Sequence, residues 1–198
     1  MNLDVAIIDS GGANLASLQY ALERLGARSI VSSDAAVIAA APRVLLPGVG
    51  AAADAMRRLR ATGLDQVIPR LQAPLLGICL GMQLLFEHST EGDTTCLGVL
   101  GGRVERLPAA PQRPVPHMGW NTLEDIGDDA LLRGIEPASH LYFVHSYAAS
   151  INGSTLATVR YGLPLAAVVG KENFRGVQFH PERSAAPGAR VLRNFLAL

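Results

Sequence analysis

The residue with the clearest chemical potential is a cysteine held between two glycines. Cys79 lies between Gly77 and Gly81, where the apolar run at residues 75–78 gives way to a helical pattern. Glycines at both flanks allow the sharp turn and close chain approach of a nucleophile elbow, and a helix N-terminus favours a thiolate. Because a lone cysteine is as often a small buried apolar residue, the elbow alone leaves both interpretations open.

A histidine and a glutamate near the other end of the chain could supply proton transfer. His180 and Glu182 stand two apart in residues 176–182, which we predict to form a strand with both side chains on one face. Pro181 between them indicates a strand end or sheet edge. Taken alone, this triplet is better explained as a turn with a solvated acid. With Cys79 it makes a nucleophile, a general acid/base and an orienting carboxylate, the set that transfer through a thioester requires.

A glycine-rich loop could complete the chemistry. Gly48 and Gly50 flank Val49 directly after the apolar run at residues 44–46. The carboxyl ends of parallel strands share one edge of a sheet, so we expect this loop near Cys79, with backbone N–H groups available to a negative oxygen. By itself the segment is better explained as a tight turn entering a helix. A phosphate-binding loop is disfavoured because the Lys and Ser/Thr of that motif are absent.

The first eighty residues contain the elements that would position these groups. Apolar runs at residues 5–8, 44–46 and 75–78 each precede a segment with helical potential. The first of these helices has leucines at helical spacing from Leu15 to Leu25 and ends at Gly26. Continuous apolar strands of this kind indicate a parallel sheet covered on both faces.

The second half of the chain has a different pattern, which predicts antiparallel or mixed strands. Four prolines in residues 108–116 indicate a surface loop rather than a linker. A terminal helix is expected at residues 187–198, with Val191, Leu192, Phe195 and Leu196 facing the core. The predicted strands are residues 99–107, 119–123, 141–148 and 155–161.

Composition limits the classes of partner. The 198 residues fit one domain, 49% are hydrophobic, and 17 basic residues balance 17 acidic ones. A neutral chain has no electrostatic footprint for nucleic acid or an anionic membrane, so small molecules and proteins remain. Cys79 and Cys96 are too far apart for a zinc site and too few for a disulfide scaffold, and Cys96 has no elbow or nearby base. With neither a signal peptide nor a membrane-length apolar run, we expect a soluble cytoplasmic protein.

Three motifs, in this order, resemble the class I glutamine amidotransferases. They are Pro-Gly-x-Gly at residues 47–50, Gly-x-Cys-x-Gly-x-Gln at 77–83 and His-Pro-Glu at 180–182. The resemblance spans most of the chain. It implies an α/β, flavodoxin-like fold over residues 1–198, a single amidotransferase domain whose mixed, largely parallel central sheet has helices on both faces. No metal or organic cofactor is implied.

The family's chemistry would be carried by Cys79, His180 and Glu182. Cys79 attacks the glutamine side-chain amide, His180 protonates ammonia and then activates water, and Glu182 orients the imidazole. Glu91 would bind the substrate α-amino group, although a glutamate in so polar a loop is ordinarily exposed. Ala148 replaces an aromatic residue common in the family, which leaves the triad untouched. Residues matching the oxyanion hole and glutamine pocket, several through backbone groups, are Gly48, Val49, Gly50, Leu80, Gln83, Glu91, His145, Ser146, Tyr147 and Ser184.

Within this family, residues 116–121 and 142–147 look like the glutaminase subunits of imidazole glycerol phosphate synthases, which serve histidine biosynthesis. That implies a heterodimer with a separate cyclase subunit, which uses the ammonia to form imidazole glycerol phosphate and aminoimidazole carboxamide ribotide. From the residues alone, Trp120 is a core or interface anchor and His145 is more often structural than catalytic. We also expect partner binding to reorient a peptide of the loop at residues 48–50, because glycine permits this cheaply.

Three other functions remain open at this level. The shared triad would equally serve an anthranilate, pyridoxal phosphate or purine synthase. A free-standing cysteine hydrolase of γ-glutamyl peptides would need the same residues and no partner. A catalytically inactive regulatory subunit is disfavoured because all three triad residues are present.

Overall fold

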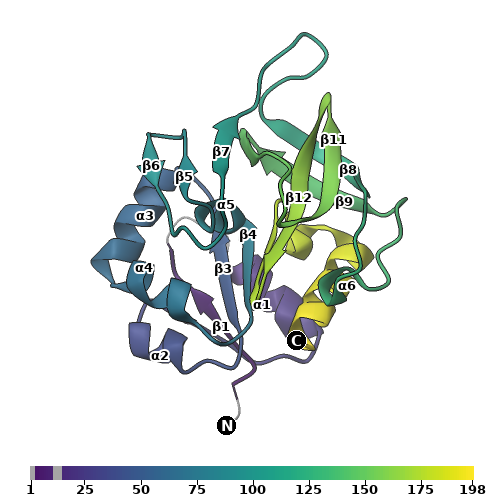
Figure 1. The fold of residues 1–198 in the computed structure, drawn as a ribbon. Helices are drawn as coiled ribbons and strands as arrows, with labels where there is room; N and C mark the ends of the chain where they lie inside the picture. The colour runs from purple at the N-terminus through teal and green to yellow at the C-terminus, as the bar shows by residue number, and fades with distance from the viewer. Residues whose placement is uncertain (1–2, 11–14) are drawn as a thin grey trace.

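The structure is a computed structural model that describes residues 3–10 and 15–198. In these residues a nine-stranded sheet runs through the molecule with helices on both faces, and a four-stranded sheet lies next to it (Figure 1). The strand order of the large sheet is β2-β1-β3-β4-β13-β12-β11-β8-β9. The predicted α/β fold with a mixed central sheet is confirmed.

One half of the large sheet is parallel. β1 pairs with β2 and β3, β3 pairs with β4, and β4 pairs with β13, all in parallel. The strands β1, β3 and β4 are buried along their whole length, as their unbroken apolar sequence predicts. In sheet order these strands are β2 (Ser29–Ser32), β1 (Val5–Ile8), β3 (Val44–Gly48), β4 (Leu75–Cys79) and β13 (Phe174–Val177).

The other half is antiparallel, so the predicted change of pattern is correct. Each of its strands pairs antiparallel with the next, beginning where β12 meets β13. Its strands are β12 (Leu163–Lys171), β11 (Thr155–Tyr161), β8 (His117–Glu124) and β9 (His140–His145). The smaller sheet consists of β10 (Tyr147–Ala149), β7 (Arg103–Arg106), β5 (His88–Ser89) and β6 (Thr94–Thr95).

Three expected strands have different ends. Of the predicted strand at residues 99–107 only β7 forms, because Gly101 and Gly102 lie in a bend and Gly102 has a φ of 108°. The segment 141–148 divides at Ser146 into β9 and β10, which belong to different sheets. The predicted strand at residues 176–182 is wrong at its end, since β13 stops at Val177 and a 3-10 helix, η3 (Pro181–Arg183), follows.

Two apolar clusters lie on opposite faces of the large sheet. Alternate residues of β1 belong to different clusters: Val5 and Ile7 to one, Ala6 and Ile8 to the other. The first cluster is covered by α1 (Leu15–Arg24), α6 (Ala185–Leu196) and η2 (Ala130–Leu132). The second is covered by α2 (Ala35–Ala39), α3 (Ala52–Ala61), α4 (Leu64–Val67), η1 (Ile68–Arg70) and α5 (Leu80–Leu84).

The predicted terminal helix and proline-rich loop are both present. Helix α6 begins two residues before the predicted start and buries Val191, Leu192 and Phe195, while Leu196 is partly buried. Residues 108–116 form a loop with one isolated bridge, between Ala110 and Arg113. Neither element contributes a triad residue.

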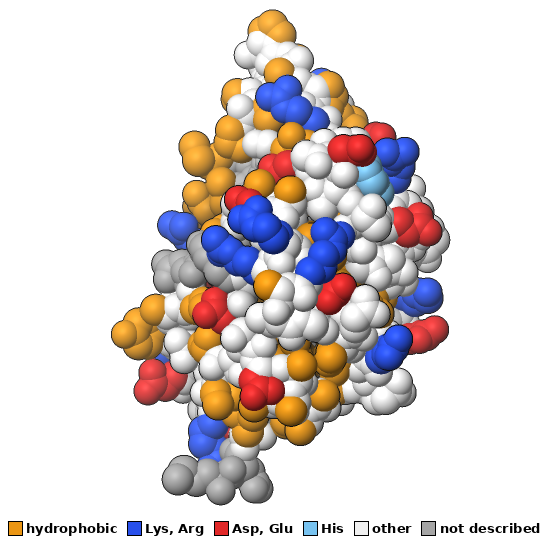
Figure 2. All heavy atoms as spheres, turned by 90° about the vertical axis from the view of Figure 1, so that its left-hand side faces the viewer, with side chains coloured by type: hydrophobic (Ala, Val, Ile, Leu, Met, Phe, Trp, Pro, Cys, Tyr) orange, Lys and Arg blue, Asp and Glu red, His pale blue; other side chains and the backbone are white. Residues whose placement is uncertain are grey.

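The outer surface of the helical side reflects the neutral composition. Figure 2 shows the side on which α3 and α4 lie, where basic and acidic side chains are interspersed with small apolar areas. On α3, for example, Arg57 pairs with Asp54 at 2.6 Å, both side chains being exposed. The described helices include none that is long and apolar enough to cross a membrane.

Candidate active site

Cys79 occupies a sharp strand-to-helix turn. It is the last residue of β4 and the N-cap of α5, and its φ and ψ are 54° and −109°. A positive φ is strained for a residue with a side chain and persists only where the surroundings enforce it. A Cβ on Gly81 would overlap the carbonyl oxygen of Leu46, and one on Gly77 would lie 2.7 Å from backbone atoms of Gly81. Both flanking glycines are therefore needed for the turn, as the sequence predicted.

His180 and Glu182 meet directly, although not on a strand. His180 Nδ1 lies 2.8 Å from Glu182 Oε1, and both side chains are about nine-tenths buried, at 8% and 10% exposure. The backbone N–H of His180 donates to the Tyr142 carbonyl at 2.9 Å, and its carbonyl accepts from Ser184 Oγ at 2.6 Å. The 3-10 helix thus presents the pair on a rigid frame, with the carboxylate behind the ring.

The far side of the His180 ring faces the cysteine. Nε2 has no hydrogen bond of ordinary geometry within the described structure, yet the Cys79 sulfur is close enough to affect its charge. Burial lowers the pKa of His180, but the interactions with Cys79 and with Glu182 outweigh it and raise that pKa to about 10. A protonated imidazole therefore stands between sulfur and carboxylate. This arrangement favours a thiolate–imidazolium pair.

A cavity of about 360 Å³ opens beside these groups. Cys79 and His180 line it, and its volume is at the small end of ligand pockets. Pro116 and Val144 also line it, although sequence reasoning did not select them. The predicted pocket residues in its wall are Val49, Gly50, Leu80, Gln83, Glu91, His145, Ser146 and Tyr147.

Two predicted pocket residues have other positions. Gly48 is outside the wall of this cavity and pairs with Cys79 in the β3–β4 ladder. Ser184 is fully buried and outside the cavity wall; its Oγ accepts from the Tyr142 N–H at 2.9 Å and donates to the His180 carbonyl. Ser184 therefore positions the base rather than contacting the space that a substrate would fill.

The glycine-rich loop follows β3 at the edge where β4 ends. Ser10 Oγ donates to the Pro47 carbonyl at 2.8 Å and anchors the start of the loop. Gly50 has a φ of 93°, with open space where a Cβ would stand. Leu80 is the first residue of α5, where a backbone N–H has no partner within its helix. Donors from the loop and from Leu80 can thus approach one oxygen bound near Cys79.

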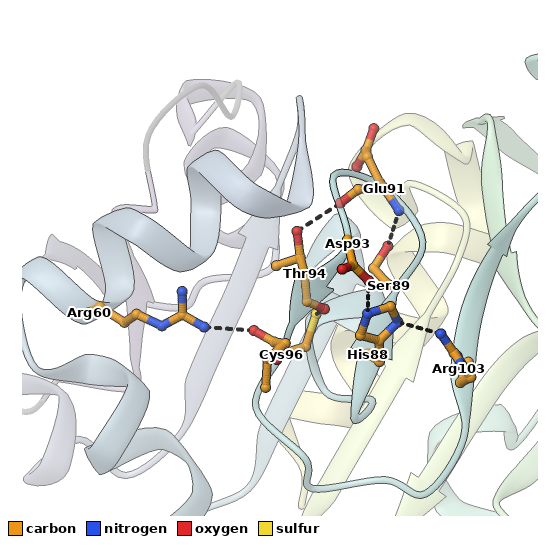
Figure 3. Close-up of polar contacts among 9 residues, drawn as sticks. Arg60, His88, Ser89, Glu91, Asp93, Thr94, Cys96 and Arg103 are labelled. Atoms are coloured by element: carbon orange, nitrogen blue, oxygen red, sulfur yellow. Dashed lines mark hydrogen bonds and ion pairs between the residues drawn. The ribbon is translucent and has the colours of Figure 1, made fainter.

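Glu91 is fixed at the cavity wall rather than free in solvent. Its backbone N–H donates to Ser89 Oγ at 3.2 Å, its carbonyl accepts from Thr94 Oγ1 at 2.7 Å, and its carboxylate points away from the other residues drawn in Figure 3. Oε2 accepts from the Ala52 N–H at 2.8 Å, in the first turn of α3. A glutamate in a polar loop would ordinarily be solvated, but here one carboxylate oxygen of Glu91 is occupied by a backbone N–H at the start of α3.

His145 forms part of a buried polar chain. Its Nδ1 lies 2.9 Å from the Tyr147 carbonyl, and its Nε2 lies 3.0 Å from Nδ1 of His117. Burial is the main cause that lowers the pKa of His145 to about 3 and that of His117 to about 4, so both rings are neutral near pH 7. This is the structural role expected for His145 from its strand pattern.

Gln178 is a residue that sequence reasoning missed. It is fully buried, and its Nε2 lies 3.7 Å from Cys79 Sγ. The available signal was an amide in an apolar run, two residues before His180 and therefore on its face of an extended chain. Cys96, by contrast, lies away from the cavity, and burial raises its pKa to about 11. The described part of the chain contains no cluster of side chains that could hold a metal ion.

Comparisons with known proteins show which family the chain resembles. The family model Glutamine amidotransferase class-I matches residues 6–198. The chain is 55% identical over 195 residues to imidazole glycerol phosphate synthase subunit HisH of Xanthomonas axonopodis pv. citri (strain 306), covering 98% of each chain. It is 53% identical, with the same coverage, to the HisH subunit of Xylella fastidiosa (strain Temecula1 / ATCC 700964).

Solved structures support the fold alone. A structure described as a glutamine amidotransferase matches with a TM-score of 0.75 at 21% identity, over 98% of this chain and 97% of that one. The structure of PurLQS from Thermotoga maritima matches with a TM-score of 0.73 at 20% identity, over 100% and 99%. Family match, near full-length identity and fold together show that the chain belongs to the class-I glutamine amidotransferases, with the HisH subunits of imidazole glycerol phosphate synthase as its relatives.

Proposed function

We propose that this chain is the glutaminase subunit of an imidazole glycerol phosphate synthase, with residues 1–198 acting as one catalytic domain. It hydrolyses L-glutamine to glutamate and ammonia, and the ammonia passes to a cyclase subunit for histidine biosynthesis. One observation carries the proposal: Cys79, strained at φ 54°, shares a cavity of about 360 Å³ with His180, whose ring is held by Glu182. The 55% identity to HisH subunits supports the pathway.

The first half-reaction forms a thioester. A sulfur lone pair of the Cys79 thiolate attacks the side-chain amide carbon of glutamine, and the C=O π electrons move to oxygen. N–H groups of Leu80 and of the loop at residues 48–50 stabilise that oxygen. His180 donates its Nε2 proton to the amide nitrogen, the C–N bond breaks, and ammonia leaves. Neutral His180 and a γ-glutamyl thioester remain, so His180 can act next as a base.

The second half-reaction restores the enzyme. His180 takes a proton from water as the water oxygen attacks the thioester carbon, and a second tetrahedral oxyanion forms at the same donors. Collapse expels the Cys79 thiolate and leaves glutamate. Glu182 keeps Nδ1 protonated and stabilises the imidazolium through both steps, because its Oε1 stays 2.8 Å from that nitrogen.

Recognition of glutamine uses the cavity wall. Among the described residues Glu91 is the one acidic side chain in that wall, and one of its oxygens is engaged by Ala52. Its remaining oxygen would bind the substrate α-ammonium group. Gln83 and Tyr147, joined by a hydrogen bond of 2.7 Å, also line the cavity. The eight predicted residues in the wall are thereby assigned to substrate binding, with Ser184 acting through His180.

A partner surface adjoins the cavity. Met118 and Trp120 project from β8 with 66% and 54% of their surface exposed, which is unusual for large apolar side chains. Met118 pairs with Val144 across β8 and β9, and Val144 lines the cavity. We assign this surface to the cyclase subunit, with Trp120 as an anchor, because a partner seated there would lie next to the site of ammonia release.

Partner binding would also activate the site. The φ of 93° at Gly50 and the open space around it permit a peptide of the loop to rotate, so a liganded partner can complete the oxyanion hole. A cytosolic location belongs to the same proposal: both cysteines are free, and the reaction requires a reduced thiol.

The test measures ammonia release from glutamine by the chain alone and with a cyclase subunit carrying its ribonucleotide ligand. We expect stimulation by the liganded partner, and loss of partner binding in Trp120→Ala. Tyr20→Ala is the matched control, since Tyr20 is 61% exposed on α1, away from the cavity. Equal rates with and without partner would remove the synthase assignment. Faster glutamate release from γ-glutamyl peptides than from glutamine would favour a free-standing hydrolase.

A further inference from the structure

We infer that Gln178 is a further catalytic residue, whose side-chain amide donates a hydrogen bond to the Cys79 sulfur and stabilises its anionic form. The inference rests on the proposed function, in which Cys79 is the nucleophile. Gln178 Nε2 lies 3.7 Å from Cys79 Sγ, and Gln178 is completely buried. A buried amide that touches the reacting atom contributes to the chemistry and not only to packing.

Besides His180, the sulfur has one uncharged partner suited to each of its protonation states. Cys79 Sγ lies 3.8 Å from the carbonyl oxygen of Val144, which can accept the proton of a neutral thiol. A thiolate has no proton to donate and only accepts. In the anionic state the Gln178 N–H remains favourable while the Val144 carbonyl does not. Gln178 therefore acts on the thiolate, both before attack and when the thioester collapses.

The surrounding amides determine which end of Gln178 faces the sulfur. Gln83 Nε2 donates to the Tyr147 carbonyl at 2.7 Å and to Gln178 Oε1 at 2.9 Å. The Tyr147 acceptor is a backbone carbonyl oxygen, whose identity is fixed, so the nitrogen of Gln83 must stand there. Gln178 consequently presents Oε1 to Gln83 and Nε2 to Cys79. Rotating its amide by 180° would place two NH₂ groups together and a carbonyl against the sulfur.

The same chain of hydrogen bonds continues away from the cavity. The Tyr147 carbonyl also accepts from His145 Nδ1 at 2.9 Å, which leaves His145 Nε2 to accept from His117 Nδ1 at 3.0 Å. His117 Nε2 in turn lies 3.3 Å from Asn121 Nδ2. Since both rings are buried and neutral, the Tyr147 carbonyl keeps its position at neutral pH. The Tyr147 carbonyl therefore fixes the orientation of the Gln83 amide, and the Gln83 amide fixes that of Gln178.

Gln178 differs from the other groups around the sulfur because it does not titrate. The ionisable side chains around the cavity that Cys79 lines are His180, with Glu182 behind it, and His145, Glu91 and Tyr147 in the wall. The Gln178 amide carries no titratable proton and donates at every pH of the experiment. Loss of the donor should therefore raise the thiol pKa and lower kcat, while KM for glutamine stays nearly constant.

The experiment uses the full-length chain with Cys96→Ala, so that only Cys79 is alkylated. The rate of reaction with iodoacetamide is followed from pH 5 to 10 without glutamine, in Gln178→Met, Gln178→Glu and the control Gln72→Met, since Gln72 is exposed. We expect the midpoint of the alkylation rate against pH to move to higher pH in Gln178→Met. It should move further in Gln178→Glu, which places an anion beside the sulfur. The control should match the parent.

Activity of the complex with the liganded cyclase subunit supplies the second readout. We expect kcat to fall about tenfold to a hundredfold in Gln178→Met with KM within about twofold, as for loss of a hydrogen bond to a charged group. An unshifted alkylation profile in a folded variant would overturn the inference, and Gln178→Glu decides the matter if Gln178→Met fails to fold. A shifted profile with unimpaired ammonia release by Cys79→Ala would instead overturn the proposed function.

Discussion

The two cysteines of this chain should differ sharply in the reactivity of their thiols. Cys79 is 6% exposed, yet it faces His180, lines a cavity and accepts a hydrogen bond from Gln178. Cys96 is the more exposed thiol, but it donates to the Thr94 carbonyl at 3.5 Å, and burial raises its pKa to about 11. Reactivity of a thiol therefore depends on which groups oppose desolvation at the sulfur, and solvent exposure alone does not indicate it.

The largest expected difference is in catalysis. Cys79→Ala should lower partner-stimulated ammonia release at least about a thousandfold, because it removes the sulfur that forms the thioester. Cys96→Ala should keep the rate within about twofold, since Cys96 lies outside the cavity wall. Both variants are assayed with the liganded cyclase subunit. Loss of activity in Cys96→Ala, in a protein that melts like the parent, would contradict the comparison.

Alkylation sharpens the same contrast without turnover. At pH 7 a thiol with the pKa of Cys96, about 11, is a thiolate in only about one molecule in ten thousand. Cys79 should therefore react with iodoacetamide at least about a hundredfold faster. Mass spectrometry of peptides after timed labelling gives both rates in one sample. Comparable labelling of the two sites would mean that the elbow does not activate its thiol.

Glycines near the two cysteines should differ in how much stability is lost when each is replaced by alanine. In Gly81→Ala the new methyl group would overlap the Leu46 carbonyl, and we expect a loss of about 3 kcal/mol or more in unfolding free energy. Gly98 has a φ of 66° and open space around a Cβ, so Gly98→Ala should cost only about 1 kcal/mol of backbone strain. Urea denaturation measures both. Equal losses would show that the elbow has room to relax.

The smallest expected effect is a change in the pKa of His180. Removing the sulfur in Cys79→Ala should lower the pKa of His180 from about 10, because burial then opposes the charge with only Glu182 to offset it. NMR titration of the ring reports this, and Cys96→Ala should leave it unchanged. A raised folded-state pKa stabilises the protein fully below about pH 6.5, and that contribution is lost as pH rises toward 10. The unfolding free energy of Cys79→Ala should therefore depend less on pH over that interval than that of the parent.

Much of the site could be predicted because its key features are local. Flanking glycines and an apolar run identify the elbow at Cys79, and the order of three motifs identifies the triad. The break at Ser146 could not be predicted, since Val144 and Tyr147 on its two sides both favour strands and only the pairing of the two strands with different sheets separates them. The partly buried, hydrogen-bonded setting of Glu91 could not be predicted for a similar reason: its partner, the N–H of Ala52, is 39 residues away.

The sequence by itself determined the kinds of groups and the local backbone that carries them. Glycine, proline and apolar periodicity act through neighbouring residues, so β4, the elbow and the helices on both faces follow from short-range rules. Only the tertiary structure decided which groups meet. Gln178 reaches Cys79 across 99 residues and Gln83 across 95, and contact with Cys79 joins that with Glu182 in raising the pKa of His180 against the effect of burial. Hydrogen bonding and desolvation depend on distances in space, which sequence spacing does not encode.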